Sequence, residues 1–189
     1  HTAYRRQRQM CIRDSYKNPV VDIAMPDPTV IKAADGYFYM YATESTRNVP
    51  IMKSKDLVQW TYCNTAFTNK TRPRFEPKAG IWAPDINYIN NKYVLYYAMS
   101  VWGGEQTCGI GVATADSPQG PFTDHGKMFR SNEIGVQNSI DPSFLQYEGR
   151  NYLVWGSFRG IYVIELTEDG LSLKPGAEKK RIAGTAFEA

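Results

Sequence analysis

Four acidic residues recur along the chain at intervals close to the length of one small structural unit: Asp27, Asp85, Asp141 and Glu188. The intervals between them are 58, 56 and 47 residues. Two carboxyl groups that face each other can hydrolyse a glycosidic bond, because one protonates the leaving oxygen while the other activates water. The spacing therefore predicts a hydrolytic carboxylate set, provided that the fold brings these positions together.

Prolines mark three of these acidic positions. Asp27 lies between Pro26 and Pro28, Asp85 follows a proline, and Asp141 precedes one. Proline fixes its own φ and disfavours the helical region for the residue before it. We therefore expect Asp27 to be extended at the start of a strand. The alternative interpretation is a turn aspartate whose side chain accepts hydrogen bonds from nearby backbone amides.

The 189 residues have the length of one ordinary domain, and no apolar run approaches the roughly 18 residues of a membrane-spanning helix. Residues 1–15 match nothing that follows and lack the apolar core of a signal peptide, so we interpret them as a non-native leader. Their arginines account for the formal net charge of +3, and the remainder of the chain is neutral. This charge distribution argues against a nucleic-acid partner.

Composition and pattern both favour an all-β fold. The chain contains 13 Tyr and 4 Trp, and its apolar runs are short and separated by turn residues such as Asp35-Gly36 and Asn90-Asn91. The 3 Cys are widely spaced, form no Cys-x-x-Cys pair and predict free thiols rather than a metal site.

From Tyr16 onward the chain repeats a pattern of four short strands. In the third repeat we expect strands at residues 141–147, 151–156, 161–166 and 171–173. One four-stranded sheet cannot bury both of its faces without neighbours, so the repeat predicts the blades of a β-propeller. The expected domains are a leader over 1–15 and a partial propeller over 16–189. The expected blades span about 16–70, 71–130 and 131–185, with a fourth beginning at 186.

In a propeller the first strand of each blade lines the central axis, so residues at the strand starts converge on one funnel. Trp82 is the best candidate for a substrate contact, since an aromatic face can stack on the C–H face of a sugar; core packing is the alternative. Trp102 and Phe158 follow second strands and are expected at the same rim.

Four motifs resemble those of the glycoside hydrolases of family 43: Ala24-Met25-Pro26-Asp27-Pro28, Ile81-Trp82-Ala83-Pro84-Asp85, Ser139-Ile140-Asp141-Pro142-Ser143 and Phe187-Glu188-Ala189. The resemblance covers residues 16–189. It implies a five-bladed propeller that cleaves arabinan, arabinoxylan or xylan side chains with inversion. About three blades and the start of a fourth would be present here, and the fragment by itself is expected to be inactive.

The resemblance also implies a role for each acidic residue. Asp27 resembles the general base and Glu188 the general acid, while Asp141 resembles a third carboxylate that raises the pKa of the acid and orients it. Asp85 has no catalytic counterpart in the family, so we interpret it as a polar residue that braces the funnel beside the substrate.

The function expected from these observations is inverting hydrolysis of α-L-arabinofuranosyl linkages in arabinan or arabinoxylan. Three alternatives stay open: a β-xylosidase of the same family, a non-catalytic propeller that binds glycan, and, ranked low, a fructan-cleaving propeller. The expected partner is a pentose-containing plant polysaccharide, which favours an extracellular or periplasmic location. No cofactor is predicted with certainty, and a structural calcium ion on the propeller axis is left open.

Overall fold

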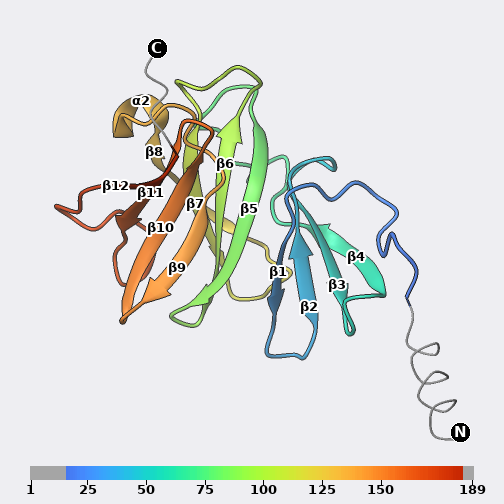
Figure 1. Cartoon of the computed structure of the whole chain (residues 1–189). Coiled ribbons are helices and arrows are strands. Elements are labelled where there is room, and N and C mark those ends of the chain that lie inside the picture. The colour runs from blue at the N-terminus through green and yellow to red at the C-terminus, as the bar shows by residue number, and fades with distance from the viewer. Residues whose placement is uncertain (1–15, 185–189) are drawn as a thin grey trace, which may run out of the picture.

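The computed structural model describes residues 16–184, which form three four-stranded antiparallel sheets (Figure 1). The first sheet contains β1 (Thr29–Lys32), β2 (Phe38–Tyr41), β3 (Pro50–Ser54) and β4 (Trp60–Thr65). The second contains β5 (Gly80–Ile89), β6 (Lys92–Ser100), β7 (Gly109–Ala115) and β8 (Thr123–Arg130). The third contains β9 (Ser143–Tyr147), β10 (Arg150–Ser157), β11 (Gly160–Glu165) and β12 (Lys180–Ala183).

Each sheet pairs its strands in chain order, as in the blades of a propeller. This confirms the expected all-β propeller fold with three blades. The one helix in the described part of the chain is α2, a single turn over Ser131–Ile134. No helix within residues 16–184 is long and apolar enough to cross a membrane.

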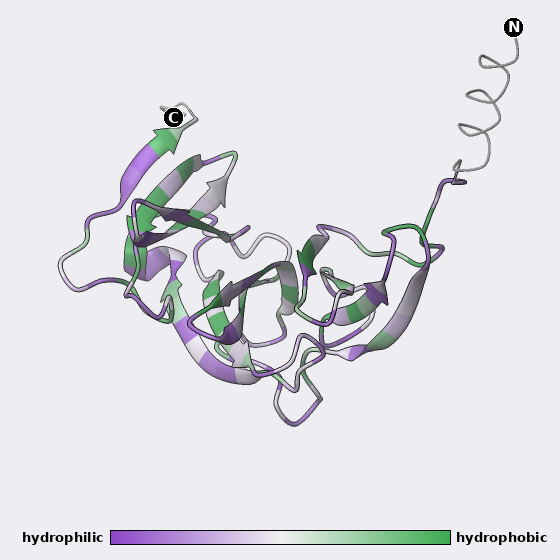
Figure 2. Ribbon diagram, turned by 90° about the horizontal axis from the view of Figure 1, so that it is seen from below, coloured by the Kyte–Doolittle hydropathy of each residue, from purple (hydrophilic) through white to green (hydrophobic). Residues whose placement is uncertain are grey.

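The three blades follow one another along an arc, which is seen from below in Figure 2. Strand β1 contacts β5, and β5 contacts β9, so the first strands of the blades lie next to one another. The side chains of β6 show why neighbouring blades are needed. Leu95 and Tyr97 pack in a core shared with the first blade, whereas Val94 and Tyr96 pack in a core shared with the third. The middle blade is therefore buried on both faces.

The first hairpin shows how local sequence builds a blade. Asp35 accepts hydrogen bonds from the Tyr37 amide at 3.0 Å and from the Tyr39 hydroxyl at 2.7 Å. Gly36 has φ +85°, a left-handed conformation that costs glycine little. The Asp-Gly pair thus forms the tight turn that the sequence predicted.

The last strand of the third blade was expected at residues 171–173, and this expectation is wrong. Leu173 forms only an isolated bridge with Leu166, and the fourth strand is β12. Pro175 lacks an amide hydrogen and Gly176 turns the chain with φ +75°, so the segment cannot continue as a paired strand. The chain loops outward before it returns along β11.

Candidate active site

A cavity of about 700 Å³ lies where the segments before β1 and β9 meet the segments that follow β2, β6 and β10. This size falls within the range of about 300–1,000 Å³ that is usual for small-molecule sites. Its lining includes five of the residues that the sequence singled out: Asp27, Trp82, Trp102, Asp141 and Phe158. All three blades contribute, so the pocket depends on how the blades are packed.

Asp27 enters the pocket from the first blade. Its φ is +48°, so the expectation of an extended residue is wrong: the following proline disfavours the right-handed helical region, but Asp27 adopts the left-handed one. Aspartate tolerates this conformation better than most residues, and such backbone strain often marks functional sites. The Asp27 carboxylate accepts a hydrogen bond of 2.7 Å from the Thr43 hydroxyl.

Asp141 enters from the third blade with the same backbone geometry. It precedes Pro142 and has φ +54°. The pocket walls displace part of the water around its carboxyl group, and this desolvation raises its pKa. The charge of Asp27 raises the pKa of Asp141 further. Two carboxyl groups from different blades are therefore electrostatically coupled across one cavity.

The second blade breaks the pattern of recurring acids. Its pre-proline residue with a left-handed backbone is Ala83, with φ +37°, and not Asp85. A register shift in β5 lies between Trp82 and Asp85. Asp85 was counted as the member of the repeat in this blade, but the structural counterpart of Asp27 there is Ala83.

Asp85 does not line the pocket. Its carboxylate accepts hydrogen bonds from the Phe144 amide at 2.7 Å and from the Asn87 side chain at 2.8 Å. Burial raises the pKa of Asp85, while hydrogen bonds from Phe144, Asn87 and Thr29 counteract this rise. Asp85 thus joins the inner strands of three blades, and its predicted contact with substrate stays untested.

Two tryptophans form an aromatic wall of the pocket. The rings of Trp82 and Trp102 lie 5.6 Å apart at an interplanar angle of 51°. Trp102 is 94% exposed, so little besides Trp82 covers it. Gly80 packs beneath Trp82, since a Cβ there would lie 2.5 Å from the indole nitrogen. A large exposed aromatic surface beside two carboxyl groups is suited to stacking on a sugar ring.

Phe158 also lines the pocket; it is 62% exposed, and the Arg159 guanidinium lies 5.0 Å from the centre of its ring. Arg159 also pairs with Glu105 at 3.0 Å. Glu105 belongs to the loop that carries Trp102, so this ion pair joins that loop to the loop that carries Phe158.

The sequence analysis missed the hydroxyl residues of the pocket. Thr43, Ser100 and Ser157 all line it, and they lie 57 residues apart in each step. Each stands at or just after the end of the second strand of its blade. This interval, which is closer to constant than that of the acids, was a signal that could have revealed them.

Two further expectations concern the general acid and a metal ion. Glu188, the predicted general acid, lies outside the described residues. Among residues 16–184, no group of three or more His, Cys, Asp or Glu side chains could hold a metal ion. An axial calcium ion stays a prediction.

Comparison with known proteins decides the family. The profile described as "Glycosyl hydrolases family 43" matches residues 16–189. The chain belongs to glycosyl hydrolase family 43. The family assignment made from the motifs around Asp27 and Asp141 is thereby confirmed.

Relatives within family 43 are named as arabinan-cleaving enzymes. The extracellular endo-α-(1→5)-L-arabinanase 1 of Bacillus subtilis is 36% identical over 177 residues, which cover 86% of this chain and 54% of the relative. The arabinan endo-1,5-α-L-arabinosidase C of Emericella nidulans is 33% identical over 156 residues, covering 80% of this chain and 48% of the relative. The chain spans about half the length of the curated relatives it matches.

Solved structures agree with the fold. The Cellvibrio cellulosa α-L-arabinanase complexed with arabinohexaose matches with a TM-score of 0.75 and 28% identity, covering 86% of this chain and 54% of that structure. The native Bacillus subtilis arabinanase matches with a TM-score of 0.72 and 31% identity, covering 82% of this chain and 56% of that structure. These family 43 neighbours share the arrangement of the three blades described here.

Proposed function

We propose that the protein hydrolyses α-L-arabinofuranosyl linkages in arabinan and inverts the configuration of the released sugar. The observation that carries the proposal is the convergence of Asp27 and Asp141, from different blades, on one pocket with an aromatic wall. The names of the family 43 relatives support arabinan as the substrate. Among pentose-containing plant polysaccharides, arabinan therefore ranks before arabinoxylan and xylan.

Asp27 acts in this proposal as the general base. Its carboxylate opens to the cavity, where a water molecule can lie between it and the anomeric carbon of the sugar. The Thr43 hydroxyl occupies one lone pair of Oδ2 and leaves Oδ1 to accept the proton of the attacking water. An inverting enzyme needs about 6.5–9.5 Å between its base and acid carboxyl groups, so that this water has room.

Asp141 serves as the supporting carboxylate, and Glu188 as the general acid. Desolvation raises the pKa of Asp141, and the charge of Asp27 raises it further. Additional negative charge near a carboxylic acid keeps that acid protonated at higher pH, which is what a proton donor requires. The proposal therefore assigns Asp141 the role of raising the pKa of the acid.

Trp82 and Trp102 bind the sugar chain. Their tilted rings present apolar faces to the cavity beside the carboxyl groups. Stacking holds a sugar without forming charged contacts, which suits a neutral polysaccharide. A β-xylosidase of the same family remains the alternative, because a pentose of similar size can stack on the same wall.

The test is an assay of the protein as its gene encodes it on linear arabinan, arabinoxylan, xylan and aryl pentosides. The proposal predicts the highest kcat/KM on arabinan. Preference for an aryl β-xyloside would favour the alternative enzyme. Binding of arabinan without release of sugar, and unchanged by Asp27→Asn, would instead identify a glycan-binding propeller.

A further inference from the structure

The hydroxyl group of Thr43 lies between the first and second blades. It donates a hydrogen bond to Oδ2 of Asp27 at 2.7 Å and accepts one from the Ala83 amide at 2.6 Å. The amide can only donate, so the single hydroxyl proton of Thr43 must be directed at Asp27. The direction of both hydrogen bonds is therefore fixed.

The backbone of Thr43 holds the other side of the Asp27 turn. Its amide donates to the Pro26 carbonyl at 2.9 Å. Asp27 is consequently held both through its carboxylate and through the peptide that precedes it. This double contact matters because Asp27 has a left-handed backbone, which is favoured only when its surroundings enforce it.

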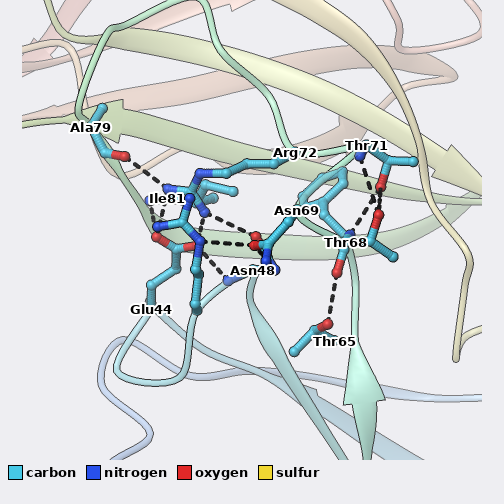
Figure 3. Close-up of polar contacts among 11 residues, drawn as sticks. Glu44, Asn48, Thr65, Thr68, Asn69, Thr71, Arg72, Ala79 and Ile81 are labelled. Carbon is cyan, nitrogen blue, oxygen red and sulfur yellow. Dashed lines mark hydrogen bonds and ion pairs between the residues drawn. The ribbon is translucent and has the colours of Figure 1, made fainter.

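The residue after Thr43 anchors the bridge to the second blade. The Glu44 amide donates to the Ile81 carbonyl, and the Ile81 amide donates to the Glu44 carboxylate, both at 3.1 Å. The same carboxylate pairs with Arg72, whose Nη2 lies 2.8 Å from Oε2, as Figure 3 shows. The side chains of Glu44 and Arg72 are only 9% and 8% exposed, so Thr43 projects from a rigid segment.

The other pocket hydroxyls make different contacts. Ser100 donates to the carbonyl of its own neighbour Val101 at 3.1 Å, and Ser157 accepts from the Arg159 amide at 3.3 Å. Both interactions stay within their own loops. Of the three repeated hydroxyls, Thr43 alone is bonded to a pocket carboxylate in the described part of the chain.

We propose that Thr43 is the positioning residue of the general base, and that its hydroxyl fixes the Asp27 carboxylate relative to the second blade. This inference rests on the proposed function, because Asp27 is the general base only in that reaction. The Thr43 hydroxyl joins Asp27 to Ala83, the neighbour of Trp82. It therefore fixes the position of the base relative to the aromatic wall that holds the sugar. Misplacement of a catalytic group by about 1 Å can cost on the order of a hundredfold in rate.

The test compares Thr43→Val, Thr43→Ala and Thr43→Ser. The first two variants lack the hydroxyl, and the third keeps it. Thr65→Val is the matched control, since the Thr65 hydroxyl also makes a 2.7 Å hydrogen bond, to the Phe67 carbonyl, but lies outside the pocket. All variants are assayed on linear arabinan in the protein as its gene encodes it.

We expect Thr43→Val to lower kcat by about 10–100-fold while KM changes by less than about threefold, because the base is misplaced but the sugar wall is intact. Thr43→Ser should restore kcat to within about fivefold of the wild type, and Thr65→Val should leave it unchanged. Unchanged kcat in Thr43→Val, or a Ser variant as slow as the Val variant, would overturn the proposal. So would failure of both hydroxyl-free variants to fold while the Ser variant folds.

A second measurement does not depend on hydrolysis. The pKa of Asp141 is raised in part by Asp27, and it can be followed by carbon NMR of the carboxyl group. Once released from Thr43, Asp27 should rotate away from Asp141 under like-charge repulsion, so the pKa of Asp141 should fall in Thr43→Val and not in Thr43→Ser. If the wild type does not cleave arabinan, the proposed function fails while this titration still tests the bridge. An Asp141 pKa that is equal in all variants would overturn the positioning role.

Discussion

Asp27 and Asp141 reach the same pocket from the first and third blades, each before a proline and each with a left-handed backbone. The charge of Asp27 contributes to the raised pKa of Asp141. This coupling means that a change at one carboxyl group should be measurable at the other, even in the absence of substrate.

Replacement of Asp27 by Asn should therefore have two effects. Turnover of arabinan should fall by about 10²–10⁴-fold, because an amide cannot accept the proton of the attacking water. The pKa of Asp141 should fall as well, since its charged neighbour is gone. Steady-state kinetics and carboxyl NMR measure the two effects separately.

Asp56→Asn is the control for this experiment. Asp56 lies in an outer turn, where its carboxylate accepts hydrogen bonds from the Val58 and Gln59 amides. Both bonds end on Oδ1, so the side-chain oxygen of Asn can accept both of them. Asp56 also lies outside the pocket. Near-normal turnover in Asp27→Asn, or an equal loss in Asp56→Asn, would contradict the assignment of the base.

The stability of the protein should depend on the charge of Asp141. Its pKa in the folded state is raised, so the folded state binds the proton more tightly than the unfolded state does. The wild type should lose stability relative to Asp141→Asn as pH rises from the ordinary pKa of about 3.9 through the raised value, and the difference should then level off. Urea unfolding of both proteins between pH 4 and 8 measures this difference. A wild type that gains stability relative to Asp141→Asn as pH rises would contradict this prediction.

Removing one partner of the buried ion pair between Arg72 and Glu44 should strongly destabilise the protein. Arg72→Met leaves the Glu44 carboxylate buried without its partner, and breaking such a pair costs about 3–5 kcal/mol. Lys92→Met is the matched control: Lys92 pairs with Asp116 at the surface, where such a pair contributes about 0–1 kcal/mol. Urea unfolding gives both values. Equal losses in the two variants would show that the Arg72 contact does not anchor the segment that carries Thr43.

Trp102 should contribute to binding and not to folding. Because its side chain is 94% exposed, Trp102→Ala should leave the unfolding midpoint unchanged. The loss of one stacking face should weaken binding of arabino-oligosaccharides by about tenfold. Tyr147→Ala, at an exposed aromatic residue outside the pocket, is the control for nonspecific sugar binding and should have no effect. Calorimetric titration with arabinohexaose distinguishes the two variants.

The repeat of short strands was predictable because each blade carries its own turn residues and apolar runs. The turn of the first hairpin, at Asp35-Gly36, was predicted from its residue types, and the structure has β1 and β2 paired across it. The fourth strand of the third blade was not, because Pro175 and Gly176 end the apolar run at 171–173 after the single bridge between Leu173 and Leu166.

Only the features of the site that depend on residue type and spacing were predictable from the sequence. A following proline marks Asp27 and Asp141, and it also marks Ala83 as their counterpart. Nothing in the sequence indicated the register shift between Trp82 and Asp85 that removes Asp85 from the pocket. The role of Thr43 depends on a contact with Ala83, 40 residues away, and such a contact exists only once two blades are packed.

The stereochemistry of the reaction tests the central claim most directly. If Asp27 activates a water molecule that attacks the sugar, the first product released from linear arabinan has the opposite anomeric configuration to that of the substrate linkage. Proton NMR of the product within the first minutes, before mutarotation, should show the β anomer of arabinofuranose. Initial release of the α anomer would mean retention through a covalent intermediate, and would contradict the role of Asp27 as a base that acts through water.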